Sequence, residues 1–126
     1  MSKYELSEEE TAQLLERLRT DRFLSERRFA ESFSRGKFRS NRWGRHKIRY
    51  ALRQKGLEDQ DIRHGLDEIP EAEYRAALYE LLEKKQTRLK PSLSLIERRQ
   101  RLLQYARQKG YETDLVRAFI RELLDD

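Results

Sequence analysis

The stretch RGKFRSNRWGRHKIRYALRQKG, residues 35–56, sets the pattern for the whole chain. It holds nine lysines and arginines, and no aspartate or glutamate lies between Glu31 and Glu58. The only tryptophan, Trp43, stands near its middle, between a predicted helix that ends at residues 39–41 and another that begins directly after it. Like charges repel one another, so such a run indicates either a solvated helix face or a surface for an anionic partner. The missing acids favour the anionic partner.

The helix predicted over residues 44–55 has two distinct faces at 100° per residue. Its apolar face comprises Ile48, Ala51 and Leu52. The stripe beside that face comprises Arg45, Arg49 and Arg53, at i, i+4 and i+8. We expect these three arginines to point outward together. Gly56 then supplies the left-handed position that ends a helix.

The composition excludes several classes of protein. Charged residues make up 40% and hydrophobic residues 37% of the 126 positions, so we expect an elongated helical shape with a modest core. The chain has no cysteine, which excludes disulfides and thiolate zinc sites and fits a cytoplasmic protein. No apolar run approaches the roughly 18 residues of a membrane span, and the first residues lack the apolar core of a secretory signal.

The net charge of +5 conceals alternating bands of charge. Residues 32–57 hold nine bases and no acid, whereas residues 58–83 hold nine acids and two bases. Residues 84–109 again hold nine bases, with one acid, Glu97. Two basic bands on either side of an acidic one predict two contacts along one extended ligand, or a repeated unit.

Helical periodicity and capping signals divide the chain into helices. Ser7 with Glu10 forms a capping box, Ser25 can cap a second helix, and Pro70 and Gly110 mark two helix ends. The predicted helices cover residues 8–20, 25 to about 40, 44–55, 59–68, 71–89, 94–109 and 113–124. No segment has the pattern of a strand, so the fold class is all-α.

An internal repeat relates the two halves of the chain. The tetrapeptide RQKG at residues 53–56 recurs at residues 107–110, 54 positions later. The same offset aligns the flanking apolar positions, for example Ile62 with Val116 and Leu66 with Ile120. Each unit is predicted to contain a long helix, a basic helix and a short helix after glycine.

No pattern in the sequence indicates catalysis. The five glycines form neither a GxxxxGK nor a GxGxxG arrangement, and no HExxH motif or Cys/His metal spacing occurs. The two histidines, His46 and His64, are far apart in the sequence, and no carboxylate pair stands out as an acid–base couple. We therefore expect a binding protein with no enzymatic activity, cofactor or metal.

One known family shares this combination of residues. The segment WGRHKIRYALRQKG, preceded by DRFLSERRFAESFSRGKFRSNR and followed by LEDQDI, resembles the central repeat of the RecX family of recombinase regulators. The stretch from Leu102 to Ile120, with Lys109-Gly110-Tyr111, resembles the last repeat of that family. The resemblance covers about residues 8–124 and rests on the order and spacing of these motifs.

The resemblance implies a fold and a function. Family members are tandem three-helix repeats, which predicts an elongated, curved helical array. They bind within the groove of the RecA–DNA filament and restrain its extension, ATPase activity and strand exchange. The resemblance further implies that residues 1–20 are the remnant last helix of a preceding repeat. Residues 21–69 would then be the first full repeat and residues 70–126 the second.

We therefore predict a negative regulator of RecA that contacts the RecA–DNA filament. DNA would be bound directly or through the filament. We also expect the protein to be monomeric and to bind no membrane. The predicted contacts of the first basic band are Arg39, Arg42, Arg45, Lys47, Arg49 and Arg53. The predicted contacts of the second are Arg98, Arg99, Arg101 and Lys109.

Two other functions fit the same residues. One is a DNA-binding module of helix-turn-helix type, suggested by the turn at Gly56. Against it, the basic helix precedes the turn, and the helix after the turn carries Glu58, Asp59 and Asp61, which phosphates would repel. The other is a structural adaptor whose basic bands pair with acidic bands of another molecule.

Overall fold

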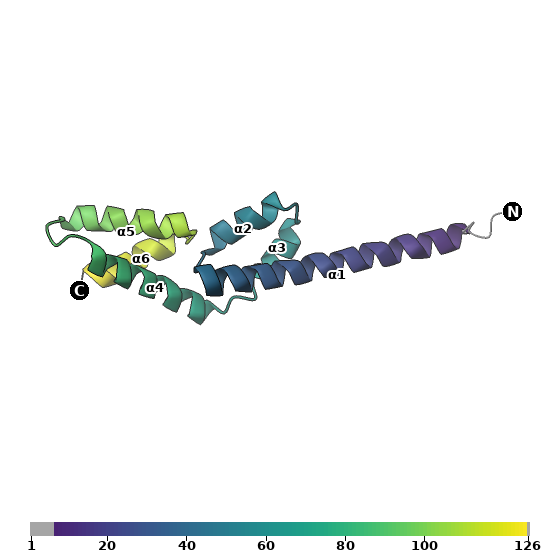
Figure 1. Cartoon of the computed structure of the whole chain (residues 1–126), viewed down its shortest axis with the longest axis horizontal. Helices are drawn as coiled ribbons and strands as arrows, with labels where there is room; N and C mark the ends of the chain where they lie inside the picture. The colour runs from purple at the N-terminus through teal and green to yellow at the C-terminus, as the bar shows by residue number, and fades with distance from the viewer. Residues whose placement is uncertain (1–6, 126) are drawn as a thin grey trace.

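The protein is built entirely from helices in the part of the chain that the structure describes, residues 7–125. In this computed structural model six helices follow one another, and no strand occurs among the described residues, which confirms the all-α fold class (Figure 1). The helices are α1 (Glu8–Asn41), α2 (Arg45–Gln54), α3 (Asp59–Leu66), α4 (Glu71–Arg88), α5 (Leu95–Lys109) and α6 (Thr113–Leu124).

The long helix α1 corrects one prediction. The sequence predicts two helices, with Ser25 capping the second, but α1 runs unbroken for 34 residues and Ser25 lies inside it. No glycine or proline stands between Thr20 and Ser25, so nothing interrupts the backbone hydrogen bonds, and extending a helix costs less than starting a new one. Ser7 caps α1, because its hydroxyl accepts a hydrogen bond from Glu10 N–H at 3.1 Å, which is one of the two hydrogen bonds of the predicted capping box.

The first unit consists of the second half of α1 with α2 and α3. Helix α3 lies very close to α1 at Gly65, where an added Cβ would lie 2.6 Å from the carbonyl oxygen of Ala30. The buried carboxylate of Asp61 pairs with Arg27 of α1 at 3.4 Å. Its buried apolar residues are Ala30, Phe38, Ile48, Leu52, Ile62 and Leu66, which belong to one core cluster that continues into α4, α5 and α6.

The second unit consists of α4, α5 and α6. Ser94 and Glu97 form a reciprocal capping box at the start of α5. Gly110 ends α5 with φ 101°, just as Gly56 follows α2 with φ 86°, so both glycines of the sequence repeat adopt the left-handed conformation. Its buried apolar residues, in the same core cluster, include Tyr74, Ala77, Leu78, Leu82, Leu102, Ala106, Val116 and Ile120.

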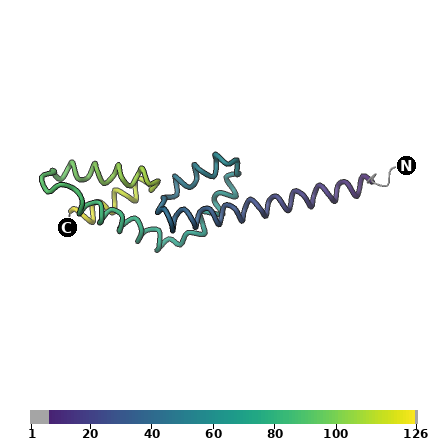
Figure 2. Tube along the Cα trace, in the orientation of Figure 1, coloured from purple at the N-terminus to yellow at the C-terminus, as the bar shows by residue number. Residues whose placement is uncertain are grey.

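The overall shape is elongated. The two units lie end to end, and the first half of α1 extends beyond both, so that the beginning of α1 and helix α6 occupy opposite ends (Figures 1 and 2). The side chains of Leu14, Leu15 and Leu18 on this extension are about half exposed, at 44%, 48% and 55%. Within residues 7–125 no helix combines the length and apolar character needed to cross a bilayer.

Candidate binding surface and the junction that shapes it

The start of α2 is held against the second unit by backbone hydrogen bonds. Gly44 N–H donates to Lys109 C=O at 2.7 Å, and His46 N–H donates to Gly110 C=O at 2.9 Å. From the other side, Tyr111 O–H donates to Arg42 C=O at 3.0 Å. The basic segment that dominates the sequence therefore forms the junction between the two units.

Only glycine fits at position 44 of this junction. An added Cβ would lie 2.3 Å from the carbonyl carbon of Gly110 and 2.4 Å from the nitrogen of Tyr111. Backbone atoms cannot move aside as a flexible side chain can. The bare backbone of Gly44 is what allows the two units to approach closely enough for their hydrogen bonds.

The side chain of Arg45 lies inside the junction. Its Nη1 donates to Glu112 Oε2 at 2.7 Å, and its Nη2 also pairs with Glu71. Its guanidinium lies 3.8 Å from the centre of the Tyr74 ring. The hydroxyl of Tyr74 accepts from Arg45 N–H at 3.0 Å and donates to the Glu112 carboxylate. One arginine thus links α2 to α4 and to the start of α6.

The charges of this cluster shift the pKa values of its members. Burial raises the pKa of Glu112, but hydrogen bonds from Tyr74 and Arg45 outweigh burial and hold the pKa below the ordinary value of 4.5. Burial and the hydrogen bond to Glu112 raise the pKa of the Tyr74 hydroxyl well above its ordinary range. Glu112 is therefore ionised and Tyr74 neutral at pH 7.

The prediction of an outward stripe formed by Arg45, Arg49 and Arg53 is therefore wrong for Arg45, whose side chain is 20% exposed. Arg53 pairs with Asp59 at 3.1 Å, and Arg49 lies 3.2 Å from Nδ1 of His46. Arg49 and Arg53 also line a small cavity of about 120 Å³ between α2 and α3. The acidic band thus partly neutralises this stripe.

A different set of cations surrounds Trp43. The Nζ atoms of Lys37 and Lys47 lie 5.0 Å and 4.7 Å from the centre of the Trp43 ring. Phe33 meets Trp43 edge to face at 6.4 Å, and both Lys37 and Lys55 lie 5.6 Å from the Phe33 ring. Lys47 and Arg49 stand 200° apart on α2, so Lys47 faces away from the arginine stripe.

Lys109 of the second unit joins this set. Its Nζ donates to Asn41 C=O at 3.5 Å, which places it beside the end of α1. A groove of about 240 Å³ runs along α1 here, lined by Ser32, Phe33, Gly36, Lys37, Ser40 and Asn41. We call the rings of Phe33 and Trp43, with Lys37, Lys47, Lys55 and Lys109, the junction surface. None of these four lysines pairs with a carboxylate within residues 7–125.

The remaining predicted residues are dispersed. Arg39 and Arg42 are exposed, and Arg42 ends α1 with a left-handed φ of 56°. Arg98 and Arg99 have partners within the second unit, since Arg98 donates to Gln86 at 3.1 Å and Arg99 pairs with Asp125. Arg101 is exposed, eight residues before Lys109 and so about 12 Å away along α5. Of the predicted residues in the second basic band, Lys109 therefore lies beside the first band, and the other three lie away from it.

Two features of the site were missed in the sequence. One is the anchoring role of Arg45, which depends on Glu112, 67 positions away in the chain. The other is the set of lysines around Phe33 and Trp43. A signal for it exists, because Phe33 and Lys37 are four residues apart on one helix face and Trp43 and Lys47 are four residues apart across the start of α2.

Comparison with known proteins gives the family. The model for the second three-helix domain of RecX matches residues 25–66, and the model for the third three-helix domain matches residues 72–120. Relatives named "Regulatory protein RecX" include that of Oceanobacillus iheyensis, 27% identical over 124 residues, and that of Bacillus mycoides, 28% identical over 127 residues.

The match extends over the whole chain but only part of each relative. It covers 98% of this chain and 45% of the Oceanobacillus protein, and 100% of this chain and 46% of the Bacillus protein. The chain therefore spans less than half the length of these relatives. No solved structure matches it. Since the two domain models together cover well over half of the chain, it belongs to the RecX family.

Proposed function

We propose that this chain is a regulator of RecA recombinase that binds in the groove of the RecA–DNA filament through the junction surface. Binding would modulate filament extension, ATP hydrolysis and strand exchange. Membership of the RecX family supports this function. The single observation that carries it is the cluster of Lys37, Lys47 and Lys55 around Phe33 and Trp43, with Lys109 beside the end of α1. Within residues 7–125 none of these lysines pairs with a carboxylate.

The lysines of the junction surface are available to an anionic partner. A cation–π contact at an exposed site contributes only about 0.5–1 kcal/mol, so an ammonium can leave a ring for a phosphate or a carboxylate at little cost. A ring uncovered in this way offers an apolar face to a base or a side chain of the partner. Arg39, in the last turn of α1, and Arg42, its C-cap residue, are exposed and add positive charge at the end of α1.

The elongated shape suits a filament as the target. A helix of 34 residues measures about 50 Å along its axis, and the second unit continues beyond it. A rigid body of this length can touch more than one subunit of a polymer, and bridging neighbours alters polymer growth without covalent chemistry. We retain the division into residues 1–20, 21–69 and 70–126 as a proposal, in which the boundary after residue 20 falls inside α1 and residues 1–6 and 126 lie outside the described part.

The charge reversal Lys37→Glu with Lys47→Glu tests the junction surface. We expect the concentration of this chain that half-inhibits DNA-dependent ATP hydrolysis by RecA to rise about tenfold or more. Two attractive contacts become repulsive, and each 1.4 kcal/mol changes affinity about tenfold. The helix signal in circular dichroism should stay unchanged, because both side chains are only half-buried.

Lys90→Glu with Arg117→Glu is the matched control, since both residues are exposed and lie outside the junction surface. It makes the same change in net charge, and we expect it to shift half-inhibition by no more than about twofold. If the two double variants weaken inhibition equally, only net charge matters and the junction surface is not the contact.

The structure speaks against the helix-turn-helix alternative. Helix α3 occupies the place of a recognition helix, yet its residues Asp61, Ile62 and Leu66 are buried. A helix held in this way against α1 has little free surface for a DNA groove. Binding to naked duplex in the absence of RecA, with unchanged affinity in the Lys37→Glu, Lys47→Glu variant, would favour that alternative.

A further inference from the structure

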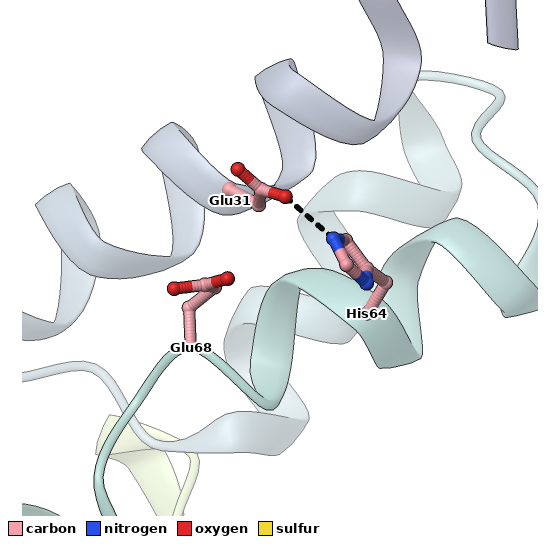
Figure 3. Close-up of side chains that lie close together, drawn as sticks. All are labelled: Glu31, His64 and Glu68. Atoms are coloured by element: carbon pink, nitrogen blue, oxygen red, sulfur yellow. Dashed lines mark hydrogen bonds and ion pairs between the residues drawn. The ribbon is translucent and has the colours of Figure 1, made fainter. Parts of the chain in front are cut away.

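Three potential metal ligands meet between α1 and α3. Glu31 comes from α1, His64 from α3, and Glu68 from the turn that follows α3 (Figure 3). One oxygen or nitrogen atom of each lies within 4.8 Å of the other two. All three residues are half-buried, and Figure 3 shows the two carboxylates and the imidazole directed toward a common space. We propose that they form a binding site for a divalent first-row transition ion of the Zn²⁺ class.

The ligand types fit such an ion. Imidazole nitrogen and carboxylate oxygen are ordinary ligands of Zn²⁺, at about 2.0–2.2 Å, and a site with three protein ligands leaves a fourth position for water. Ligand atoms around a tetrahedral ion of this size lie about 3.4 Å apart. Nε2 of His64 lies 2.5 Å from Glu31 Oε1, and one ligand atom of each residue lies within 4.8 Å of the other two, so the three groups are close enough to share one ion. Small side-chain adjustments would bring the three ligand atoms to the spacing that the ion requires.

The present partners of these groups do not prevent binding. Nε2 of His64, the nitrogen nearest Glu31, would exchange its hydrogen bond for the ion and leave the ring proton on Nδ1. Arg35 is the competing cation, and its Nη1 lies 3.4 Å from Glu68 Oε2, a long contact. With neutral imidazole, the two carboxylates exceed the single guanidinium by one negative charge, which favours a cation at this place.

An ion bound here would act as a clamp on the first unit. Glu31 and His64 are 33 positions apart in the sequence, so the site exists only when α3 is packed against α1. A ligand that binds only the folded state stabilises it in proportion to the logarithm of its concentration. The proposed effect is a first unit that is more stable in the presence of the ion, independent of any contact with RecA.

The test uses Zn²⁺ itself with the 126-residue chain at pH 7.5. We expect calorimetry to show one ion bound per chain and the unfolding temperature to rise by several degrees, an effect reversed by a chelator. His64→Gln and Glu68→Gln should each weaken binding at least tenfold. The chain has two histidines, so the imidazole NMR signals of His64 should shift on addition of Zn²⁺ while those of His46 stay in place.

His46→Gln is the matched control, because this exposed histidine lies outside the cluster, and it should bind Zn²⁺ as the unaltered chain does. Arg35→Gln removes the competing cation and should tighten binding. The proposal is overturned if no ion binds at micromolar concentrations, or if His46→Gln lowers affinity as much as His64→Gln. Because none of these measurements involves RecA, their failure would leave the proposed regulatory function untouched.

Discussion

Replacing Gly44 by alanine is expected to destabilise the protein by about 2–4 kcal/mol, because the junction leaves no room for a methyl group at this position. The new Cβ would lie 2.3–2.4 Å from the carbonyl group of Gly110 and the nitrogen of Tyr111. The units must separate to relieve this overlap, and the hydrogen bonds from Gly44 to Lys109 and from His46 to Gly110 would then lengthen or break. Urea unfolding followed by circular dichroism measures the change.

Gly36→Ala provides the matched control for that experiment. An added Cβ at Gly36 meets nothing within 4 Å, and the residue lies in the interior of α1. Alanine in a helix interior is favoured over glycine by about 0.5–1 kcal/mol, so this variant should be more stable than the unaltered chain. If Gly44→Ala behaved like Gly36→Ala, the close packing of the two units at Gly44 would be disproved.

The second large effect is expected for Arg45→Met, which removes the guanidinium but keeps much of the side-chain volume. We expect a loss of about 2–3 kcal/mol at pH 7, because Glu112 would remain half-buried without its cation. Glu71 contributes less to this loss, since its side chain is 57% exposed. Arg45→Lys should recover only part of the lost stability, because an ammonium cannot contact Glu71 and Glu112 through two separate nitrogens as the guanidinium does.

The loss should depend on pH in a defined direction. Burial raises the pKa of Glu112, and the hydrogen bonds from Tyr74 and Arg45 outweigh it to hold the pKa below 4.5. A carboxyl with a lowered pKa in the folded state stabilises that state above its unfolded pKa, and this contribution disappears as pH falls through the folded pKa. The difference in unfolding free energy between the unaltered chain and Arg45→Met should therefore be largest at pH 7 and shrink at about pH 3.

Arg101→Met is the control for this series, since Arg101 is exposed and pairs with no carboxylate within residues 7–125. It should change the unfolding free energy by no more than about 0.5 kcal/mol at either pH. A destabilisation by Arg45→Met that is the same at pH 7 and pH 3 would show that lost packing, and not the pairing with Glu112, is responsible.

Most of the fold follows from local signals in the sequence. Helices α4 and α5 begin directly after Pro70 and Ser94, and helices α2 and α5 end near Gly56 and Gly110. Each of these residues favours such a position through its own backbone geometry or side chain. The RecX resemblance, based on the order of such signals, was confirmed by the family models. The break predicted near Ser25 failed because a serine permits a helix start but does not enforce one.

The site was less predictable because it depends on which helix faces meet. Periodicity places Arg45, Arg49 and Arg53 on one side of α2, but it does not reveal that Glu71 and Glu112 approach that side. Similarly, the bands that appear separate along the chain converge where Lys109 reaches Asn41. Counting charges along the sequence does not show which of them form ion pairs, because pairing depends on how the helices of the two units pack.

The contacts between main-chain atoms at Gly44, Lys109 and Gly110 have a consequence for the evolution of such proteins. Hydrogen bonds between peptide groups depend little on the neighbouring side chains, except that glycine is needed at position 44, where the backbones of the two units meet. Residues on the outer faces of α2 and α5 can therefore change without removing these hydrogen bonds. Substitutions there would retune the preference for a target without rebuilding the scaffold.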